Sequence, residues 1–348
     1  TILQLSSCFP TISSISSHPL FPSCSKGPMP AANENQTVVK EFVLVGFASI
    51  PSSQGLLFAL FLAIYVVTLA SNGIIITLTS TDPNLDTPMY YFLRNLSVID
   101  ICYISSTVPQ LLVHFLSHTR TISMLACATQ NYAFFAFGVT ECFLLAVMSY
   151  DRYVAICNPL HYSVVMSHQA CAKLAAGSWV SGFLHSVVLT VFTFHLPFCG
   201  PNCIDHFFCE APQVLKLACT NTYVNELVIF AVAVLVLIIP LSLVFVSYSR
   251  ILATILQMST AAGRRKTFST CASHLTVVSL FYGAAIFMYM RPRSTHSPQQ
   301  DKMISLFYDK YISLLYGAVT PILNPLIYSL RNKDVKEALR NRHLAPIH

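Results

Sequence analysis

The chain has 348 residues, of which 54% are hydrophobic and only 10% are charged, and its formal net charge is +6. Soluble domains carry about 25% charged residues, so this composition excludes most soluble classes. The hydrophobic residues are gathered into runs long enough to cross a bilayer as helices. We therefore expect an all-α membrane protein. Its positive charge requires no nucleic-acid partner, because a cytosolic excess of Lys and Arg explains it.

The first 55 residues precede the first long hydrophobic run. Residues 1–28 are rich in Ser and Pro, and they lack the basic start and the apolar core of a signal peptide. We expect residues 1–32 to be a disordered extension and residues 33–55 to be an extracellular tail. Asn35 begins an Asn-Gln-Thr sequon, which is glycosylated only on the extracytosolic side.

Seven hydrophobic runs follow between residues 56 and 330. They are long and continuously apolar, without the alternation of barrel strands, so each predicts a membrane-spanning helix. The runs cover 56–80, 89–112, 126–150, 170–196, 224–255, 267–290 and 303–330. The sequence thus predicts a seven-transmembrane helix bundle, followed in residues 331–348 by a short amphipathic C-terminal helix and a cytoplasmic tail.

The distribution of basic residues predicts the orientation of this bundle. With the N-terminus outside, twelve of the 20 Lys and Arg residues fall on the cytosolic side and eight outside. The cytosolic ones lie close to helix ends, where the positive-inside rule applies. Together with the sequon at Asn35, this favours a multi-pass protein with an extracellular N-terminus.

Few ionisable residues interrupt the runs, so each one is informative. Asp100 lies in the second run and Glu141 in the third, near mid-membrane. Intramembrane carboxylates are costly and usually face the interior of a bundle, where Asn72 and Asn324 could join them. Two interpretations remain open: a cluster that holds Na⁺, a proton or ordered water, and a purely structural hydrogen-bonded core.

Residues 148–162 read MSYDRYVAICNPLHY and follow directly on the third run. This motif places an acid and a base, Asp151 and Arg152, where a hydrophobic helix should leave the membrane. Such a pair is costly in lipid, but it is well placed to face water and to hold a conformational switch.

The cysteines predict a stapled outer loop. Four of the twelve lie in one loop, namely Cys199, Cys203, Cys209 and Cys219, and Cys127 lies at the outer end of the third run. Because outer loops face an oxidising compartment, we expect Cys127 to pair with Cys209 and Cys199 with Cys219, which leaves Cys203 unpaired. Spacing alone does not determine this connectivity.

The same loop contains His206, Cys209 and Glu210, which could together bind a soft metal ion. We favour an oxidised Cys209 and a merely polar His206, since two or three ligands make a poor metal site. No metal site is therefore predicted.

A second motif, PILNPLIY at 321–328, lies in the seventh run. Pro325 removes a backbone hydrogen bond and weakens the helix locally. Asn324 and Tyr328 are four residues apart and share a face. The motif predicts a hinge with two polar groups near the cytosolic end, rather than a plain kink.

These features resemble the rhodopsin-like G-protein-coupled receptors, with Asn72, Asp100, Arg152, Trp179 and the NPLIY motif at 324–328 in the family's pattern. Five strings in order more specifically resemble the olfactory receptor family. They are PMYYFL at 88–93, MSYDRYVAICNPLHY, SYS at 247–249, KTFSTCASHL at 266–275 and PILNPLIYSLRN at 321–332. The IDHFFC loop is similar to the class II branch. Ser71, where the family usually has Gly, and the extension at 1–28 depart from the pattern without removing a switch residue.

The resemblance implies an odorant receptor in the plasma membrane of olfactory sensory cilia. Its partners would be a small volatile odorant and a heterotrimeric, olfactory-type stimulatory G protein, whose activation raises cAMP. The implied G-protein switch comprises Asp151, Arg152, Tyr248, His274, Asn324, Pro325 and Tyr328.

By the same resemblance, a ligand pocket lies in the outer half of the bundle. Its walls would be Phe134, Phe135, Gly138, Val139, Val232, Val236, Tyr282, Ile286 and Tyr289. These residues are mostly apolar, which suits a volatile apolar ligand, and Tyr289 is the best candidate for one directional hydrogen bond. Phe134 and Phe135 stand where an amine receptor would place an acid, so a cationic monoamine is disfavoured.

The sequence leaves two other classes of protein open. A non-sensory chemoreceptor of the same fold, for a metabolite or lipid, would differ in where it is expressed rather than in sequence. A transporter or channel is disfavoured because the chain shows neither an internal repeat nor a charged pore. The sequence contains no nucleophile–base set and no closed metal site, so we expect neither an enzyme nor a cofactor.

Overall fold

The computed structural model describes residues 39–46, 54–117, 120–199, 202–290, 312–314, 317, 320–330 and 333–344. Within this part of the chain, six helices are long and apolar enough to cross a membrane. They are α1 (Gln54–Thr81), α2 (Pro88–Leu116), α3 (Met124–Cys157), α5 (His168–Phe194), α7 (Tyr223–Gln257) and α8 (Ala261–Tyr289). The seventh run is described mainly as α10 (Thr320–Leu330), and most of its earlier residues lie outside the described ranges.

The helices begin and end within a few residues of the predicted runs, except that α3 continues to Cys157 and α8 begins at Ala261. Both extensions carry polar residues. A helix can continue beyond the membrane into water, so its ends need not coincide with the ends of the apolar run. The pair Asp151 and Arg152 consequently lies within α3 and not beyond its end. The fold is the predicted all-α membrane protein with a seven-transmembrane helix bundle.

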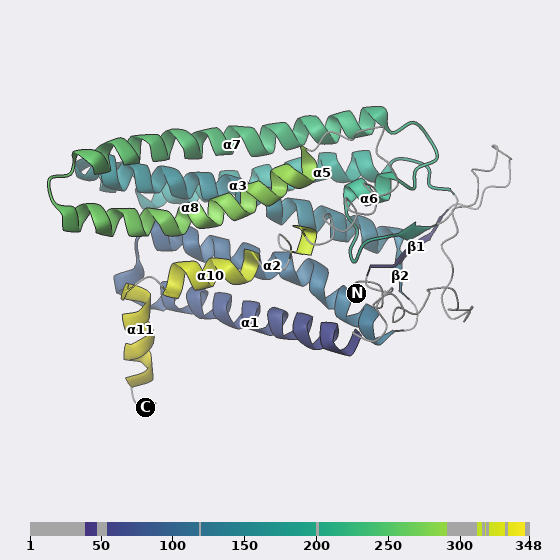
Figure 1. Ribbon diagram of the computed structural model, residues 1–348, viewed down its shortest axis with the longest axis horizontal. Helices are drawn as coiled ribbons and strands as arrows, with labels where there is room; N and C mark the ends of the chain where they lie inside the picture. Colours follow the sequence, from purple (N-terminus) through teal and green to yellow (C-terminus); the bar gives the residue numbers. More distant parts are fainter. Residues whose placement is uncertain are drawn as a thin grey trace, which may run out of the picture.

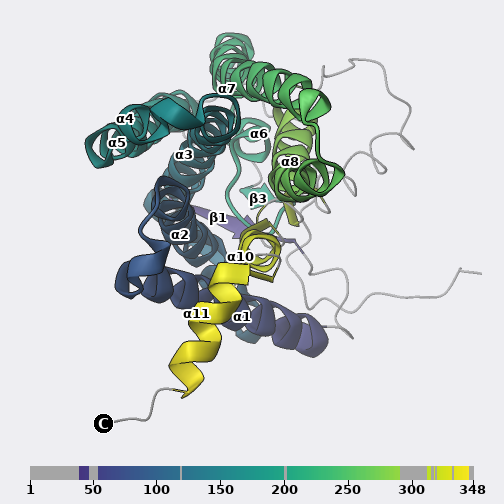
Figure 2. The same ribbon diagram turned by 90° about the vertical axis from the view of Figure 1, so that its left-hand side faces the viewer.

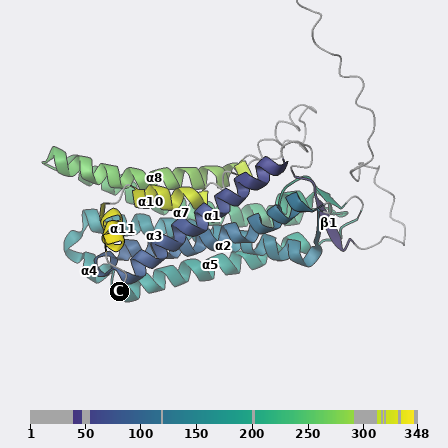
Figure 3. The ribbon, with the colours of Figure 1, turned by 90° about the horizontal axis from the view of Figure 1, so that it is seen from below.

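The long helices run side by side along the longest axis of the molecule (Figure 1). One end of the bundle carries the three short strands, and we call it the sheet end. The opposite end carries the connection from α7 to α8 and the helix α11 (Lys333–Leu344), and we call it the α11 end (Figure 3).

Helix α3 is the central helix of the bundle. The most apolar stretch of α3 is 72% buried, against 22% for that of α1. Viewed from the α11 end, α3 is surrounded by α2, α5, α7 and α8 (Figure 2). Large apolar side chains on the outer helices remain exposed instead, among them Val66, Leu184 and Phe245. Exposed apolar surface on this scale requires lipid as the surrounding solvent.

The contact between α3 and α5 is very close because Gly182 has no side chain. A Cβ atom at this position would overlap the Thr140 hydroxyl oxygen and lie 2.6 Å from the carbonyl oxygen of Ala136. Small residues allow two helix backbones to approach closely in membranes, where van der Waals packing replaces the hydrophobic effect as the main attraction. Gly182 therefore determines how deeply α5 seats against α3.

The strands form a small sheet that caps one end of the bundle. Its order is β2 (Thr121–Ser123), β1 (Glu41–Leu44) and β3 (Cys203–Ile204), with β1 antiparallel to β2 and parallel to β3. Phe42 and Leu44 of β1 are buried against Phe198 and Ile204. The segment predicted as an extracellular tail thus contributes the central strand of this cap.

Short helices complete the described connections. They are η2 (Pro83–Leu85), η3 (Pro159–His161), α4 (Tyr162–Val165) and α6 (Ala211–Leu215). Helix α11 corresponds to the predicted amphipathic C-terminal helix: Val335 and Ala338 are buried on one face, while Lys336 and Glu337 are exposed on the other.

Candidate functional site

Disulfides hold the loop between α5 and α7 across the sheet end. Cys127 at the start of α3 is bonded to Cys209, and Cys199 is bonded to Cys219, so both predicted pairs are confirmed. Cys203 is also disulfide-bonded, and the expectation of an unpaired thiol there is wrong. Counting only the loop cysteines and Cys127 could not reveal a partner for it. Because Cys209 is oxidised, its thiolate is not available to the metal site that the sequence left as an alternative.

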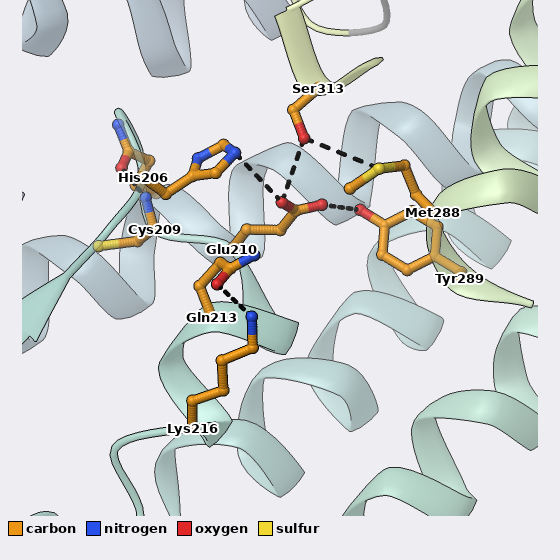
Figure 4. Close-up of polar contacts among 9 residues, drawn as sticks. His206, Cys209, Glu210, Gln213, Lys216, Met288, Tyr289 and Ser313 are labelled. Carbon is orange, nitrogen blue, oxygen red and sulfur yellow. Dashed lines mark hydrogen bonds and ion pairs between the residues drawn. The ribbon is translucent and has the colours of Figure 1, made fainter. Parts of the chain in front are cut away.

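A buried carboxylate lies directly beside the disulfide. Glu210 is only 1% exposed, and its two oxygens make separate contacts (Figure 4). The Tyr289 hydroxyl donates a hydrogen bond to Oε1 at 2.8 Å, and the Ser313 hydroxyl donates one to Oε2 at 3.4 Å. His206 Nε2 lies 3.8 Å from the same Oε2 atom. This cluster ties the loop to α8 and to the segment 312–314.

The loop is also tied to the central helix. The backbone N–H of Cys209 donates a hydrogen bond of 2.9 Å to Oε1 of Gln130, and the side-chain amide of Gln130 donates one of 3.0 Å to the carbonyl oxygen of Ser106 on α2. A buried amide that satisfies both its oxygen and its nitrogen in this way gives the loop one defined position.

A cavity of about 40 Å³ lies below the Glu210 cluster, between α3, α7 and α8. Its walls are apolar apart from Tyr289, whose hydroxyl group is the one bonded to Glu210. Six of the nine residues expected in a pocket line it: Phe135, Gly138, Val139, Val232, Val236 and Tyr289. Other lining residues were not expected from the sequence, among them Leu189 from α5 and Ala285 from α8.

The other three expected residues lie elsewhere. The Phe134 ring is buried between Tyr103 and Phe208, with ring centroids 5.0 and 4.8 Å away. The Tyr282 hydroxyl donates a hydrogen bond of 2.7 Å to the carbonyl oxygen of Cys142, so Tyr282 joins α8 to α3. Ile286 is half-buried against the core, outside the lining of this cavity.

The polar residues predicted near mid-membrane form one buried cluster. The Asn324 amide lies 2.9 Å from Oδ1 of Asp100 and 3.1 Å from Oε1 of Glu141, and it donates hydrogen bonds to both carboxylates. Asn72 donates a bond of 3.1 Å to the carbonyl oxygen of Pro321. A proton or a small cation between the two carboxylates would offset their charge in lipid, whereas the hydrogen bonds from Asn324 fit a purely structural core. The geometry therefore keeps both interpretations of this cluster open.

At the α11 end, the charged pair of α3 has two separate partners. Tyr162 donates a hydrogen bond of 2.9 Å to Oδ1 of Asp151. Burial, and next the negative charge of Asp151, raise the pKa of the Tyr162 hydroxyl, so it remains a donor at neutral pH. Arg152 donates from Nη1 to the carbonyl oxygen of Thr270 on α8 at 3.4 Å. Arg152 is 6% exposed and Asp151 is 3% exposed.

The remaining switch candidates lie on α7, α8 and α10. A hydrogen bond of 2.8 Å joins the Tyr248 hydroxyl of α7 to Nδ1 of His274 on α8. Pro325 is buried in α10 next to Asn324. The side chain of Tyr328 lies outside the described residues, as do Asn35 and its sequon.

Two of these contacts, Ser313 with Glu210 and Arg152 with the Thr270 carbonyl, were not predictable from the sequence. Ser313 was not singled out, because a single Ser in a hydrophobic run gives no signal of its own. Thr270 acts through its backbone carbonyl, which no side-chain pattern can reveal. Glu210 was considered only as a metal ligand, although a carboxylate next to a predicted disulfide in a buried loop already required a hydrogen-bonding partner.

Comparison with known proteins decides the family. The family model described as olfactory receptor matches residues 61–345. Human olfactory receptor 10A7 is 52% identical over 307 residues, which are 88% of this chain and 95% of that protein. Human olfactory receptor 2D2 is 53% identical over 306 residues, covering 88% and 96%. Mouse olfactory receptor 2B6 is 51% identical over 306 residues, covering 88% and 95%.

The chain belongs to the olfactory receptor family. It is a multi-pass membrane receptor of the G-protein-coupled class and not an enzyme. The resemblance stated from its motifs is thereby confirmed over most of the chain.

Removing the disulfide between α3 and the loop should destabilise this receptor. In Cys127→Ser the loop loses a link that typically contributes about 2–5 kcal/mol in disulfide-bonded extracellular domains. At Cys209 the loop would then be held to α3 only by the hydrogen bond to Gln130, so Glu210 would be fixed less firmly against Tyr289 of α8. We expect retention in the endoplasmic reticulum, measured by surface biotinylation.

Cys157→Ser is the matched control. Cys157 is a free cysteine whose sulfur lies 3.1 Å from the Thr254 hydroxyl, a contact that Ser can also make. Normal surface levels of Cys127→Ser would contradict the structural importance of this disulfide.

Proposed function

We propose that this odorant receptor binds small, volatile, apolar molecules in the cavity between α3, α7 and α8, and that binding activates a stimulatory G protein and raises cAMP. The observation that carries the proposal is the alignment of three features along the bundle. These are an apolar cavity, a polar cluster beside it at the sheet end, and hydrogen bonds that hold α8 closed at the α11 end.

The orientation follows from chemistry at the two ends. The disulfides lie at the sheet end, and disulfides persist in oxidising compartments. Exposed basic residues, among them Arg264 and Arg265, lie at the α11 end, which suits the cytosolic side. We therefore place the sheet end outside the cell and the α11 end in the cytosol, in the plasma membrane of olfactory sensory cilia.

The size of the cavity restricts how a ligand enters. Sites for drug-sized ligands typically measure about 300–1,000 Å³, far more than the 40 Å³ of this cavity. An odorant must therefore push α3, α7 and α8 apart or reorient their side chains. A ligand that binds the expanded arrangement better than the closed one shifts the receptor toward it.

Tyr289 is suited to report that expansion. Its ring lines the cavity, and its hydroxyl hydrogen is donated to Glu210, which leaves the oxygen able to accept a hydrogen bond from an odorant hydroxyl. Movement of the ring alters the contact of α8 with the outer loop. A signal from the cavity can thus pass into α8.

The far end of α8 is held by two hydrogen bonds. Arg152 bonds to the carbonyl oxygen of Thr270, and Tyr248 bonds to His274. Outward movement of α8 would break the first contact and free the guanidinium group to line a cytosolic cleft for a G-protein helix. Tyr248 and Tyr328 would regroup around that cleft, and the hinge at Asn324 and Pro325 would allow α10 to repack.

Enlarging the cavity should change the preferred ligand. In Val236→Ala two carbon atoms leave the wall, so odorants longer by one or two methylene groups should gain about tenfold in potency. The measurement is a cAMP reporter response to homologous series of aliphatic alcohols and aldehydes.

Val244→Ala is the control, because Val244 is equally buried two turns further along α7 but does not line the cavity. An unchanged chain-length preference in Val236→Ala, or the same change in both variants, would place the ligand elsewhere.

Removing the guanidinium group of Arg152 should weaken signalling strongly and leave the receptor at the cell surface. Arg152→Ala removes the guanidinium group that would line the open cleft, and a hydrogen bond from such a charged group to the G protein would contribute about 1.5–3 kcal/mol. The variant should therefore lower agonist-evoked cAMP by about tenfold or more, even though it also loses the contact with Thr270 that holds α8 closed. Surface expression, measured in the same cells, should stay detectable.

Arg94→Ala serves as the control at the same end of the bundle, because the Arg94 guanidinium donates to the Ser80 hydroxyl and lies over the Tyr91 ring. Normal cAMP responses from Arg152→Ala would contradict the proposal that Arg152 is part of the G-protein switch.

A further inference from the structure

A second and larger cavity lies outside the bundle core, in a groove between α3, α5 and α7. Its volume is about 350 Å³, within the range of ligand sites in proteins. Its lining includes Phe143 and Val147 of α3 and Pro240 and Leu243 of α7. Leu243 is 43% exposed, so this wall faces the lipid and not the interior.

The groove exists because α5 approaches α3 closely at one level and leaves space at another. Gly182 presses against Thr140 and Ala136, as described above. Nearer the α11 end, Gly177 lines the groove, and a Cβ atom there would meet nothing within 4 Å. A glycine at this position keeps the space open, whereas most other residues would fill it.

One charged side chain lines the groove, and it is a cation. Lys173 lies in the second turn of α5, near the α11 end, and is exposed. None of the other lining residues in the described part of the chain is acidic. A Lys at this depth extends its ammonium group toward the interface while its methylene groups cover apolar surface. The groove therefore combines an apolar wall with a positive charge at the level of lipid headgroups.

We propose that this groove binds an acidic phospholipid of the cytosolic leaflet, with an acyl chain against α3 and α7 and its headgroup phosphate at Lys173. The choice of leaflet rests on the orientation proposed above. The cytosolic leaflet carries the anionic lipids that basic sites between membrane helices select. Charge complementarity distinguishes this occupant from a sterol, which needs no cation.

The bound lipid would lie behind the odorant cavity. Cys142 and Val236 line that cavity, while Phe143 and Ile239, on the same two helices, line the groove. Pro240 lacks a backbone N–H, so the carbonyl of Val236 loses its helical hydrogen bond and α7 is locally easier to bend. A lipid in the groove supports α7 at this weak point.

The experiment uses the purified full-length receptor in nanodiscs, without odorant or G protein. Discs of phosphatidylcholine alone are compared with discs that also contain phosphatidylserine and with discs that contain cholesterol instead, and the thermal unfolding midpoint is measured. Binding to the folded state should raise the midpoint by about 4 °C or more in phosphatidylserine. Gly177→Leu, which fills the groove, and Lys173→Gln, which removes the charge, should both lose most of this increase.

Gly73→Leu on α1 is the matched control, because a Cβ atom there also meets nothing within 4 Å, yet Gly73 lies away from the groove. It should keep the full increase. A phosphatidylserine carrying a photoreactive acyl chain should, in addition, crosslink to α5 and α7 in the native receptor but not in Gly177→Leu.

Three outcomes would overturn the proposal. The first is an equal midpoint in both kinds of disc, and the second is an increase that Gly177→Leu and Lys173→Gln both retain. The third is an increase sensitive to Gly177 that cholesterol produces and phosphatidylserine does not. Both leaflets of a nanodisc have the same composition and no odorant is present, so failure here is distinguishable from failure of the proposed odorant site or orientation.

Discussion

The bundle depends on the polar side chains that α3 carries through the membrane. Lipid offers no hydrogen bonds, so each polar group must find a partner on another part of the protein. Gln130 bonds to the carbonyl of Ser106 on α2 and to the outer loop, and Asn131 bonds to Thr190 on α5. Glu141 accepts a bond from Asn324 on α10, and Arg152 donates one to α8. Helices α2, α5, α8 and α10 are thus each fixed to α3 by a specific bond in addition to apolar packing, which alone specifies position poorly in lipid.

These bonds differ in what they allow to move. The disulfide and the amide of Gln130 hold the outer loop firmly on α3. Helix α8, by contrast, meets its neighbours through separate hydrogen bonds at different levels: Tyr289 to Glu210, Tyr282 to Cys142, His274 to Tyr248, and the carbonyl of Thr270 to Arg152. A helix held at a few points can rotate or tilt when one contact changes. The arrangement therefore makes α8 the element that an odorant in the adjacent cavity would displace.

Much of the fold was predictable because long apolar runs have few structural solutions in lipid. The six described spans, the two disulfides and the C-terminal helix were all expected from sequence. Rotation of each helix about its axis was harder to predict, since lipid-facing and core-facing residues are both apolar. For this reason two residues expected in the pocket lie elsewhere: Phe134 packs against Phe208 of the outer loop, and Tyr282 donates a hydrogen bond to α3. The sheet was missed because its strands are two to four residues long and come from three distant segments. Contacts through backbone carbonyls, such as that of Thr270, leave no trace in a side-chain pattern.

The central claim is that α8 is held to α3 at the cytosolic end and separates from it on activation. The most direct test is the distance between two spin labels, one at Leu160 just after α3 and one at Arg264 at the start of α8, both at exposed positions. The distance would be measured by double electron–electron resonance, for the receptor alone and with agonist and G protein. The labels would be introduced into a variant in which the free cysteines are replaced. We expect a longer distance in the complex, and a second, longer population already with agonist alone. An unchanged distance in a receptor that still activates its G protein would contradict it.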